Sequence, residues 1–267
     1  MTRSETTNGR LSDIIRYLIV YGVLLVSPPV IVAICVVVVD RLHGGTMDSD
    51  SVWQTPFMTA SMLLGTVLAI VVFLWRRWAV LGLGRIRRAD VLKVCLMAIV
   101  LFIGWYLPEE LLQRLVEVSD NLSDKEFEQL TSGVAGLIDT AVVAPIAEEL
   151  LCRGAILGTL LKMMPRRPWV AIVISALIFG VIHLNPVQMV FGTLYGLLLG
   201  WLAWRTGSLL PSIVVHVANN TTVMLMPASA EKVIVNMSLI TEVLLAGVSL
   251  IVLFAALRWF NLRYKYI

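Results

Sequence analysis

Charged residues are scarce in this sequence: Asp, Glu, Lys and Arg make up 15% of the 267 residues, whereas hydrophobic residues make up 58%. This balance is far more apolar than that of soluble proteins, and it predicts a multispanning membrane protein. The net charge of +3 is small, and the basic residues lie in short loops rather than in a tail or along one helix face. Nucleic acid is therefore not expected as a partner.

Cysteine and several catalytic motifs are also missing or rare. The three cysteines, Cys35, Cys95 and Cys152, are odd in number and lie in apolar stretches. We expect no disulfide framework and interpret them as small core residues. The sequence lacks HExxH and GxSxG, and the glycine pair Gly82 and Gly84 lacks the third glycine of GxGxxG. Metzincin, hydrolase-elbow and dinucleotide-binding functions are therefore not indicated.

Eight apolar runs approach the length of about 20 residues that a helix needs to cross the hydrocarbon core. The expected spans are 17–39, 57–75, 91–107, 134–161, 169–184, 188–204, 209–226 and 234–257. We therefore expect an all-α fold, a polytopic membrane helix bundle of about eight transmembrane helices. The stretch 109–130 interleaves charged and apolar residues, as expected of an amphipathic helix on the outer face, and a solvated connecting helix is the simpler interpretation.

Lysine and arginine are concentrated in every second connection, as the positive-inside rule predicts for cytoplasmic loops. They cluster before span one and after spans two, four, six and eight. The first apolar run is too long for a signal peptide and is expected to be retained. We therefore predict an integral, multi-pass membrane protein with both termini in the cytoplasm, and the basic N-terminus and short loops favour a bacterial cell membrane.

Ionisable side chains occur inside three of the expected spans, where each costs about 2.5 to 3.5 kcal/mol on insertion scales. These polar residues are Glu148, Glu149 and Arg153 in span four, His183 in span five, and His216 with Asn220 in span seven. Any one cluster alone is more simply interpreted as a structural ion pair or an interhelical hydrogen bond. Three clusters in one chain instead indicate a functional site.

Several of these residues are four positions apart, a spacing that places two side chains on one helix face. The pairs are Glu149 with Arg153, Phe179 with His183, and His216 with Asn220. Glu148 lies about 100° around the helix from Glu149 and is expected to point toward a neighbouring helix. We interpret Glu149 and Arg153 as an ion pair that supports the site.

Two alternatives for the chemistry follow from these residues. A carboxylate with an imidazole can activate water, while a second imidazole with an amide can stabilise an oxyanion, which suits peptide hydrolysis. The same Glu oxygen and two His nitrogens also suit a zinc ion with water in the open position. A transporter with a carboxylate proton relay is a third interpretation, weakened because no inverted repeat is detectable.

Two further features concern packing. Gly192, Gly196 and Gly200 recur every four residues in span six. This stripe is expected to let another helix approach closely, and it is given no chemical role. Pro186 disfavours helix at Asn185, so a turn is expected between spans five and six.

Three motifs, EELLCR, FGVIH and HVANN, match the pattern EExxxR, FxxxH and HxxxN in that order. They closely resemble the CPBP family, which comprises type II CAAX prenyl proteases and bacteriocin-processing relatives. The resemblance covers 134–226, where it implies a catalytic core of spans four to seven. The rest of the chain is expected to form N-terminal spans with the outer amphipathic segment over 1–133, and a C-terminal span with a cytoplasmic tail over 227–267.

The resemblance implies an intramembrane endopeptidase. Its catalytic residues would be Glu148 and His183, which activate the attacking water, and His216 and Asn220, which stabilise the oxyanion. Its supporting residues would be Glu149, Arg153 and Phe179.

No obligatory cofactor is expected; a divalent metal such as Zn²⁺, if present, would be held by Glu148, His183 and His216. The expected partners are the lipid bilayer and a membrane-associated protein or peptide substrate, with lipidated proteins among the candidates. A non-catalytic membrane scaffold or bacteriocin self-immunity protein of the same fold is the alternative.

Overall fold

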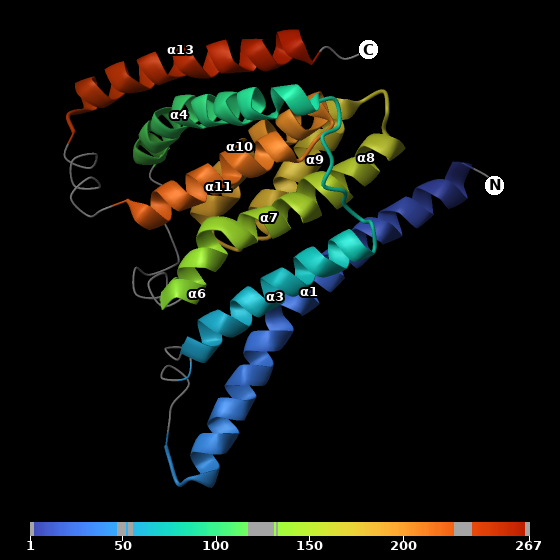
Figure 1. Ribbon diagram of the computed structural model, residues 1–267, viewed down its shortest axis with the longest axis vertical. Helices are drawn as coiled ribbons and strands as arrows, with labels where there is room; N and C mark the ends of the chain where they lie inside the picture. The colour runs from blue at the N-terminus through green and yellow to red at the C-terminus, as the bar shows by residue number, and fades with distance from the viewer. Residues whose placement is uncertain are drawn as a thin grey trace. The chain divides into compact units, whose positions relative to one another are not determined.

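The computed structural model describes residues 3–46, 52, 56–116, 131, 133–226 and 237–264, with side chains from residue 11 onward. Over these ranges the regular structure is helical and includes no strand. The separate helices are α1 (Arg3–Leu42), α3 (Pro56–Trp75), α4 (Val91–Val116), α9 (Pro168–Val181), α10 (Pro186–Thr206), α11 (Leu210–Leu225) and α13 (Leu239–Arg263) (Figure 1). A continuous helical run joins α6 (Gly133–Ile138), α7 (Ala144–Glu149) and α8 (Gly158–Met163) through two π-helical segments, Asp139–Val143 and Leu150–Leu157.

The described helices confirm an all-α membrane fold. Five of them, α1, α3, α4, α10 and α13, are long and apolar enough to cross a membrane, and α9 is a shorter apolar helix. Each of the eight expected spans overlaps a helix. Span 169–184 runs past the end of α9 at Val181, and span 234–257 begins before α13, with 234–236 outside the described residues. Ile19, Val23 and Val26 of α1 are 58–59% exposed, and such an apolar outer face suits lipid rather than water.

The prediction of a separate amphipathic helix that begins at residue 109 is wrong. Residues 109–116 continue α4 without a break through Pro108, and 117–130 lie outside the described residues. The continuation is held by two side-chain contacts. The Trp105 indole N–H donates a hydrogen bond to Glu109, and Arg114 forms an ion pair of 2.6 Å with Glu242.

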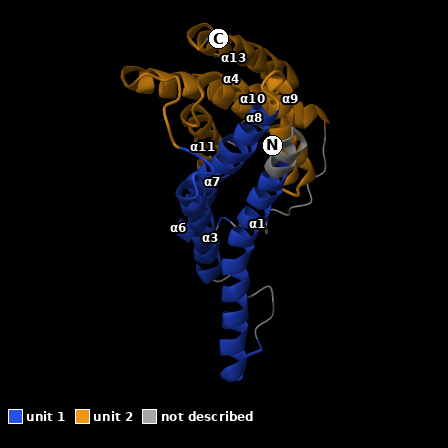
Figure 2. Cartoon of the chain, turned by 90° about the vertical axis from the view of Figure 1, so that its right-hand side faces the viewer, with its two compact units in different colours: residues 1–80, 122–163 blue, residues 81–121, 164–267 orange. Residues whose placement is uncertain are grey.

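Packing divides the chain into two compact units (Figure 2). Unit 1 comprises residues 1–80 and 122–163, and unit 2 comprises residues 81–121 and 164–267. The units are defined by packing, whereas the functional boundaries near 134 and 226 remain a prediction. The expected core residues are divided between the units: Glu148, Glu149 and Arg153 lie in unit 1, and Phe179, His183, His216 and Asn220 lie in unit 2.

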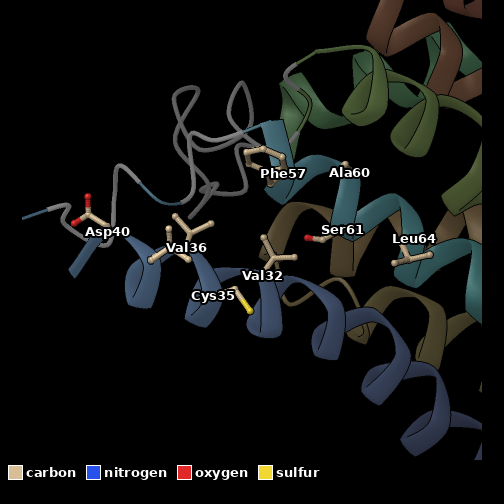
Figure 3. A pocket seen from close by; sticks show the side chains of 9 residues that line it. Val32, Cys35, Val36, Asp40, Phe57, Ala60, Ser61 and Leu64 are labelled. Carbon is tan, nitrogen blue, oxygen red and sulfur yellow. The ribbon is translucent and has the colours of Figure 1, made fainter. Parts of the chain in front are cut away.

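In unit 1, α1 packs along α3 with direct backbone contact. A Cβ added to Gly65 would lie 2.6 Å from the carbonyl oxygen of Leu24, so this position accepts only glycine without a shift of the helices. An apolar groove of about 710 Å³ also lies between these helices. Figure 3 shows its lining side chains, among them Val32 and Cys35 from α1 and Phe57 and Leu64 from α3.

The cysteines only partly match the expectation of core residues. Cys152 is buried, Cys95 is half-buried and Cys35 is exposed. The expectation is wrong for Cys35 because its side chain borders the groove between α1 and α3. None of the three forms a disulfide.

In unit 2, α4 and α13 lie side by side in an antiparallel arrangement (Figure 1). The start of α4 is joined to the end of α13 by the 2.6 Å ion pair between Asp90 and Arg263. Near the middle, a Cβ added to Gly104 would lie 2.5 Å from the Leu253 backbone nitrogen. The ion pair between Arg114 and Glu242 closes the other end. The two helices are therefore fixed to each other along their length.

The expected glycine stripe of α10 is a packing surface, and the helix that approaches it is α9. A Cβ on Gly200 would lie 3.1 Å from Ile172, and Gly192 lies in van der Waals range of Gly180. Gly180 is itself close to α10, because its Cβ would lie 2.2 Å from the Thr193 hydroxyl. Close packing of α9 and α10 thus extends to the residue that follows Phe179.

Both ends of α10 follow from local sequence. At the start, the Asn185 side chain accepts a hydrogen bond of 3.1 Å from the Gln188 N–H, and Pro186 occupies the first turn. This confirms the expected turn and is a common way to begin a helix. At the end, Gly207 adopts a left-handed φ of 64° and contacts Gly84. The pair Gly82 and Gly84 therefore belongs to a loop that packs against the end of α10.

Candidate active site

The helix that carries EELLCR is not a regular α-helix. Its π-helical segments, Asp139–Val143 and Leu150–Leu157, flank the α-helical turns that carry Glu148 and Glu149. Pro145 lacks an N–H and crowds the carbonyl four residues earlier, which gives a physical reason for the wider hydrogen-bond pattern before it. Single π turns inside helices are frequent at functional sites.

Glu149 and Arg153 form the ion pair that their spacing predicts. Arg153 Nη1 lies 3.1 Å from Glu149 Oε1, and both side chains are fully buried. Removing two charges from solvent costs several kcal/mol per ion, which their mutual attraction must offset. The two charges therefore compensate each other within unit 1.

Glu148 differs from Glu149 in its surroundings. Its side chain is half-buried, and it interacts electrostatically with Tyr21 of α1 and with Asp139. Asp139 is buried and accepts a hydrogen bond of 3.3 Å from the Thr66 hydroxyl of α3. Glu148 thus belongs to a polar cluster in unit 1 that includes Tyr21, Thr66 and Asp139.

Neither Asp139 nor Tyr21 belongs to the site predicted from the sequence. Asp139 is an acidic residue inside an expected span. Because burying a charge there is costly, its position alone indicates a functional residue. Tyr21 gave no such signal, because its interactions with Asp139 and Glu148 join residues more than 100 positions apart.

His183 lies just beyond the helix on which it was expected. α9 ends at Val181, and the chain turns at residues 182 and 183. His183 Nδ1 lies 2.7 Å from the Phe179 carbonyl oxygen. Since a carbonyl only accepts, this hydrogen bond requires the proton on Nδ1, and in the neutral ring Nε2 is then the unprotonated nitrogen. The ring centroids of Phe179 and His183 are 5.0 Å apart, so the two side chains are in contact although His183 lies beyond the helix.

His216 lies on α11 and is buried. Its ring centroid is 5.5 Å from that of Phe179, with the planes at 81°. The structure therefore brings His183 and His216 together around one phenylalanine within unit 2. Asn220 follows one turn later on α11, where its Oδ1 accepts a hydrogen bond of 3.5 Å from Asn219.

Glu148, His183 and His216 are of residue types that bind zinc, because imidazoles and a carboxylate are ordinary zinc ligands. The hydrogen bond from His183 to a backbone carbonyl is also how metal-binding histidines are usually oriented. It orients a histidine that acts as a base equally well. Within either unit, the described residues gather no three His, Cys, Asp or Glu side chains that could hold a metal.

One comparison with known proteins gives a match. Residues 130–222 match the family model for type II CAAX prenyl endopeptidase Rce1-like proteins, which is about a third of the chain. No curated protein and no solved structure matches the chain.

The matched segment includes all three motifs, from Glu148 to Asn220. The family implies a protease with a protein substrate in a membrane context, which agrees with the five apolar helices. The chain therefore carries, over residues 130–222, the domain of the Rce1-like type II CAAX prenyl endopeptidases of the CPBP family.

Proposed function

We propose that this protein is an intramembrane endopeptidase that cleaves a membrane-associated protein or peptide, with both of its own termini in the cytoplasm. The observation that carries the proposal is the coincidence of three polar motifs with one matched family segment. The gathering of His183 and His216 around Phe179 supports it, because two imidazoles with defined surroundings suit acid–base chemistry.

In the proposed reaction, Glu148 and His183 act together on one water molecule. Glu148 takes a proton from the water, and the hydroxide attacks the carbonyl carbon of the scissile bond. His183 holds the water through its basic Nε2. The proton held by Glu148 then passes to the leaving amine, so that the amine departs neutral and a carboxylic acid remains.

The tetrahedral intermediate carries a negative charge on the former carbonyl oxygen. We assign its stabilisation to the ring N–H of His216 and the side-chain N–H of Asn220. Donors fixed in a water-poor site contribute about 10²- to 10³-fold each to kcat in comparable hydrolases. Glu149 and Arg153 do not contact the substrate in this scheme but support the helix that carries Glu148.

Metal removal is expected to leave activity intact. A zinc ion, if resident, would be held by Glu148, His183 and His216 and would supply an acidified water. The residues above can instead activate water directly, so we expect full turnover after chelation. Elemental analysis of the chelated protein should then find less than about 0.1 zinc per protein molecule. A zinc-dependent protease treated in the same buffer serves as the control. Loss of turnover that returns with added Zn²⁺ would overturn the metal-free mechanism.

The proposed function is tested by the N-termini of membrane proteins in cells. Cells that contain the wild-type protein should show a set of new N-termini that disappears when His183 is replaced by alanine, at equal protein levels. A non-catalytic scaffold or self-immunity protein predicts identical termini in the two strains. That result, together with a retained cellular phenotype, would refute the protease and favour the scaffold.

A further inference from the structure

We propose that Tyr195 is a positioning residue for His216. Tyr195 lies on α10 among the glycines of the packing stripe, and none of the three motifs includes it. The inference rests on the proposed function, because the orientation of His216 matters for turnover only if its imidazole acts on the substrate.

Two aromatic rings fix the plane of the His216 imidazole. Its centroid lies 5.8 Å from the Tyr195 ring at 85° and 5.5 Å from the Phe179 ring at 81°. Such edge-to-face contacts between rings are favourable. All three side chains are buried, with 2–4% exposure. Rotation of the imidazole about its Cβ–Cγ bond would therefore bring it against one ring or the other.

Tyr195 is itself fixed at both ends. Its hydroxyl donates a hydrogen bond of 2.9 Å to the carbonyl of Val215, the residue directly before His216. Its ring packs on Trp105 of α4 at 5.8 Å, and the Trp105 indole is held by Glu109. Tyr195 thus connects α4, α10 and α11 at the position of His216.

This arrangement has a consequence for the reaction. A donor stabilises a developing oxyanion only when it lies about 2.7 to 3.1 Å from the position that the oxygen will occupy. An imidazole that can rotate spends part of its time with the N–H directed elsewhere. Loss of a group that orients a metal-binding histidine commonly costs about 10- to 100-fold in activity, and we expect a loss of the same order for His216.

The kinetic test replaces Tyr195 in two ways. Tyr195→Leu removes the ring and should lower kcat about 10- to 100-fold while KM changes less than about 2-fold. Tyr195→Phe keeps the ring and loses only the bond to Val215, so kcat should fall less than about 5-fold. Phe260→Leu is the matched control, because Phe260 is equally buried in unit 2 but contacts Trp201, Trp259 and Tyr264 instead.

Coupling distinguishes positioning from general damage. In a His216→Ala background, Tyr195→Leu should cause no further loss of kcat, because the residue it positions is gone. An additive loss, or a loss no larger than that of Phe260→Leu, would overturn the proposal.

A second readout does not depend on cleavage. The chain has only three histidines, so ¹³C-labelled imidazoles in detergent micelles give three ring signals, which single His variants assign. The His216 ring should be rigid in the wild type and in Tyr195→Phe, and mobile in Tyr195→Leu. A rigid His216 ring in Tyr195→Leu would refute positioning. If the wild type cleaves nothing, the proposed function fails, and the ring mobility still decides the role of Tyr195.

Discussion

Replacement of Glu148 by glutamine is expected to lower the kcat of peptide cleavage by about 10²- to 10⁴-fold, the usual contribution of a general base. Glutamine keeps the volume of the side chain and can still form hydrogen bonds, but it cannot take a proton from water. Because Glu148 is only half-buried and lies outside the Glu149–Arg153 pair, the change should not disturb folding. The measurement is single-turnover cleavage of a membrane-tethered peptide in liposomes.

The same helix offers a matched control. Asp139→Asn makes the same change from carboxylate to amide on a buried residue of the helical run that carries Glu148. We expect this variant to keep turnover within about 10-fold of the wild type. Asp139 belongs to none of the three motifs, and its carboxylate accepts a hydrogen bond from Thr66. Abolished cleavage in Asp139→Asn with normal cleavage in Glu148→Gln would move the general base to Asp139.

Arg153→Met is expected to destabilise the protein by about 3 to 5 kcal/mol, which is the usual cost of breaking a buried ion pair. The variant leaves Glu149 fully buried beside an apolar side chain, whereas the wild type places a guanidinium 3.1 Å from its carboxylate. The measurement is the free energy of unfolding by SDS titration in mixed micelles. Cleavage per folded molecule should fall much less than in Glu148→Gln, because Arg153 acts through the fold.

Two further variants make this prediction specific. The double variant Glu149→Met with Arg153→Met should recover most of the lost stability, since removing both charges leaves no uncompensated group. Arg16→Met breaks the half-exposed pair with Asp13 on α1 and should cost less than about 1 kcal/mol. A double variant as unstable as Arg153→Met would show that the loss comes from packing and not from the buried charge.

The helices were predictable from the sequence because hydropathy alone decides which segments can be buried in lipid. The turn between α9 and α10 was predictable for a local reason, since Asn185 and Pro186 begin a helix by their own chemistry. The ion pair between Glu149 and Arg153 was predictable because residues four apart meet on any helical surface. Each of these features depends on residues that are close together in the chain.

The environment of the candidate site was less predictable because its contacts join distant parts of the chain. The hydrogen bond between Thr66 and Asp139 spans 73 residues, and that between Tyr195 and Val215 spans 20. No local spacing indicates such pairs. The π-helical segments around Glu148 were also missed, because residue spacing was counted on a uniform α-helix of about 3.6 residues per turn.

The pairing of α4 with α13 has a consequence for the order of assembly during synthesis. α4 ends at Val116 and α13 begins at Leu239, so the ribosome has added more than 100 residues before the partner of Gly104 exists. Domains generally fold as units as the chain emerges, yet unit 2 lacks one of its helices until residues 239–263 have been added. Until then, the face of α4 that α13 covers in the folded protein stays without that partner.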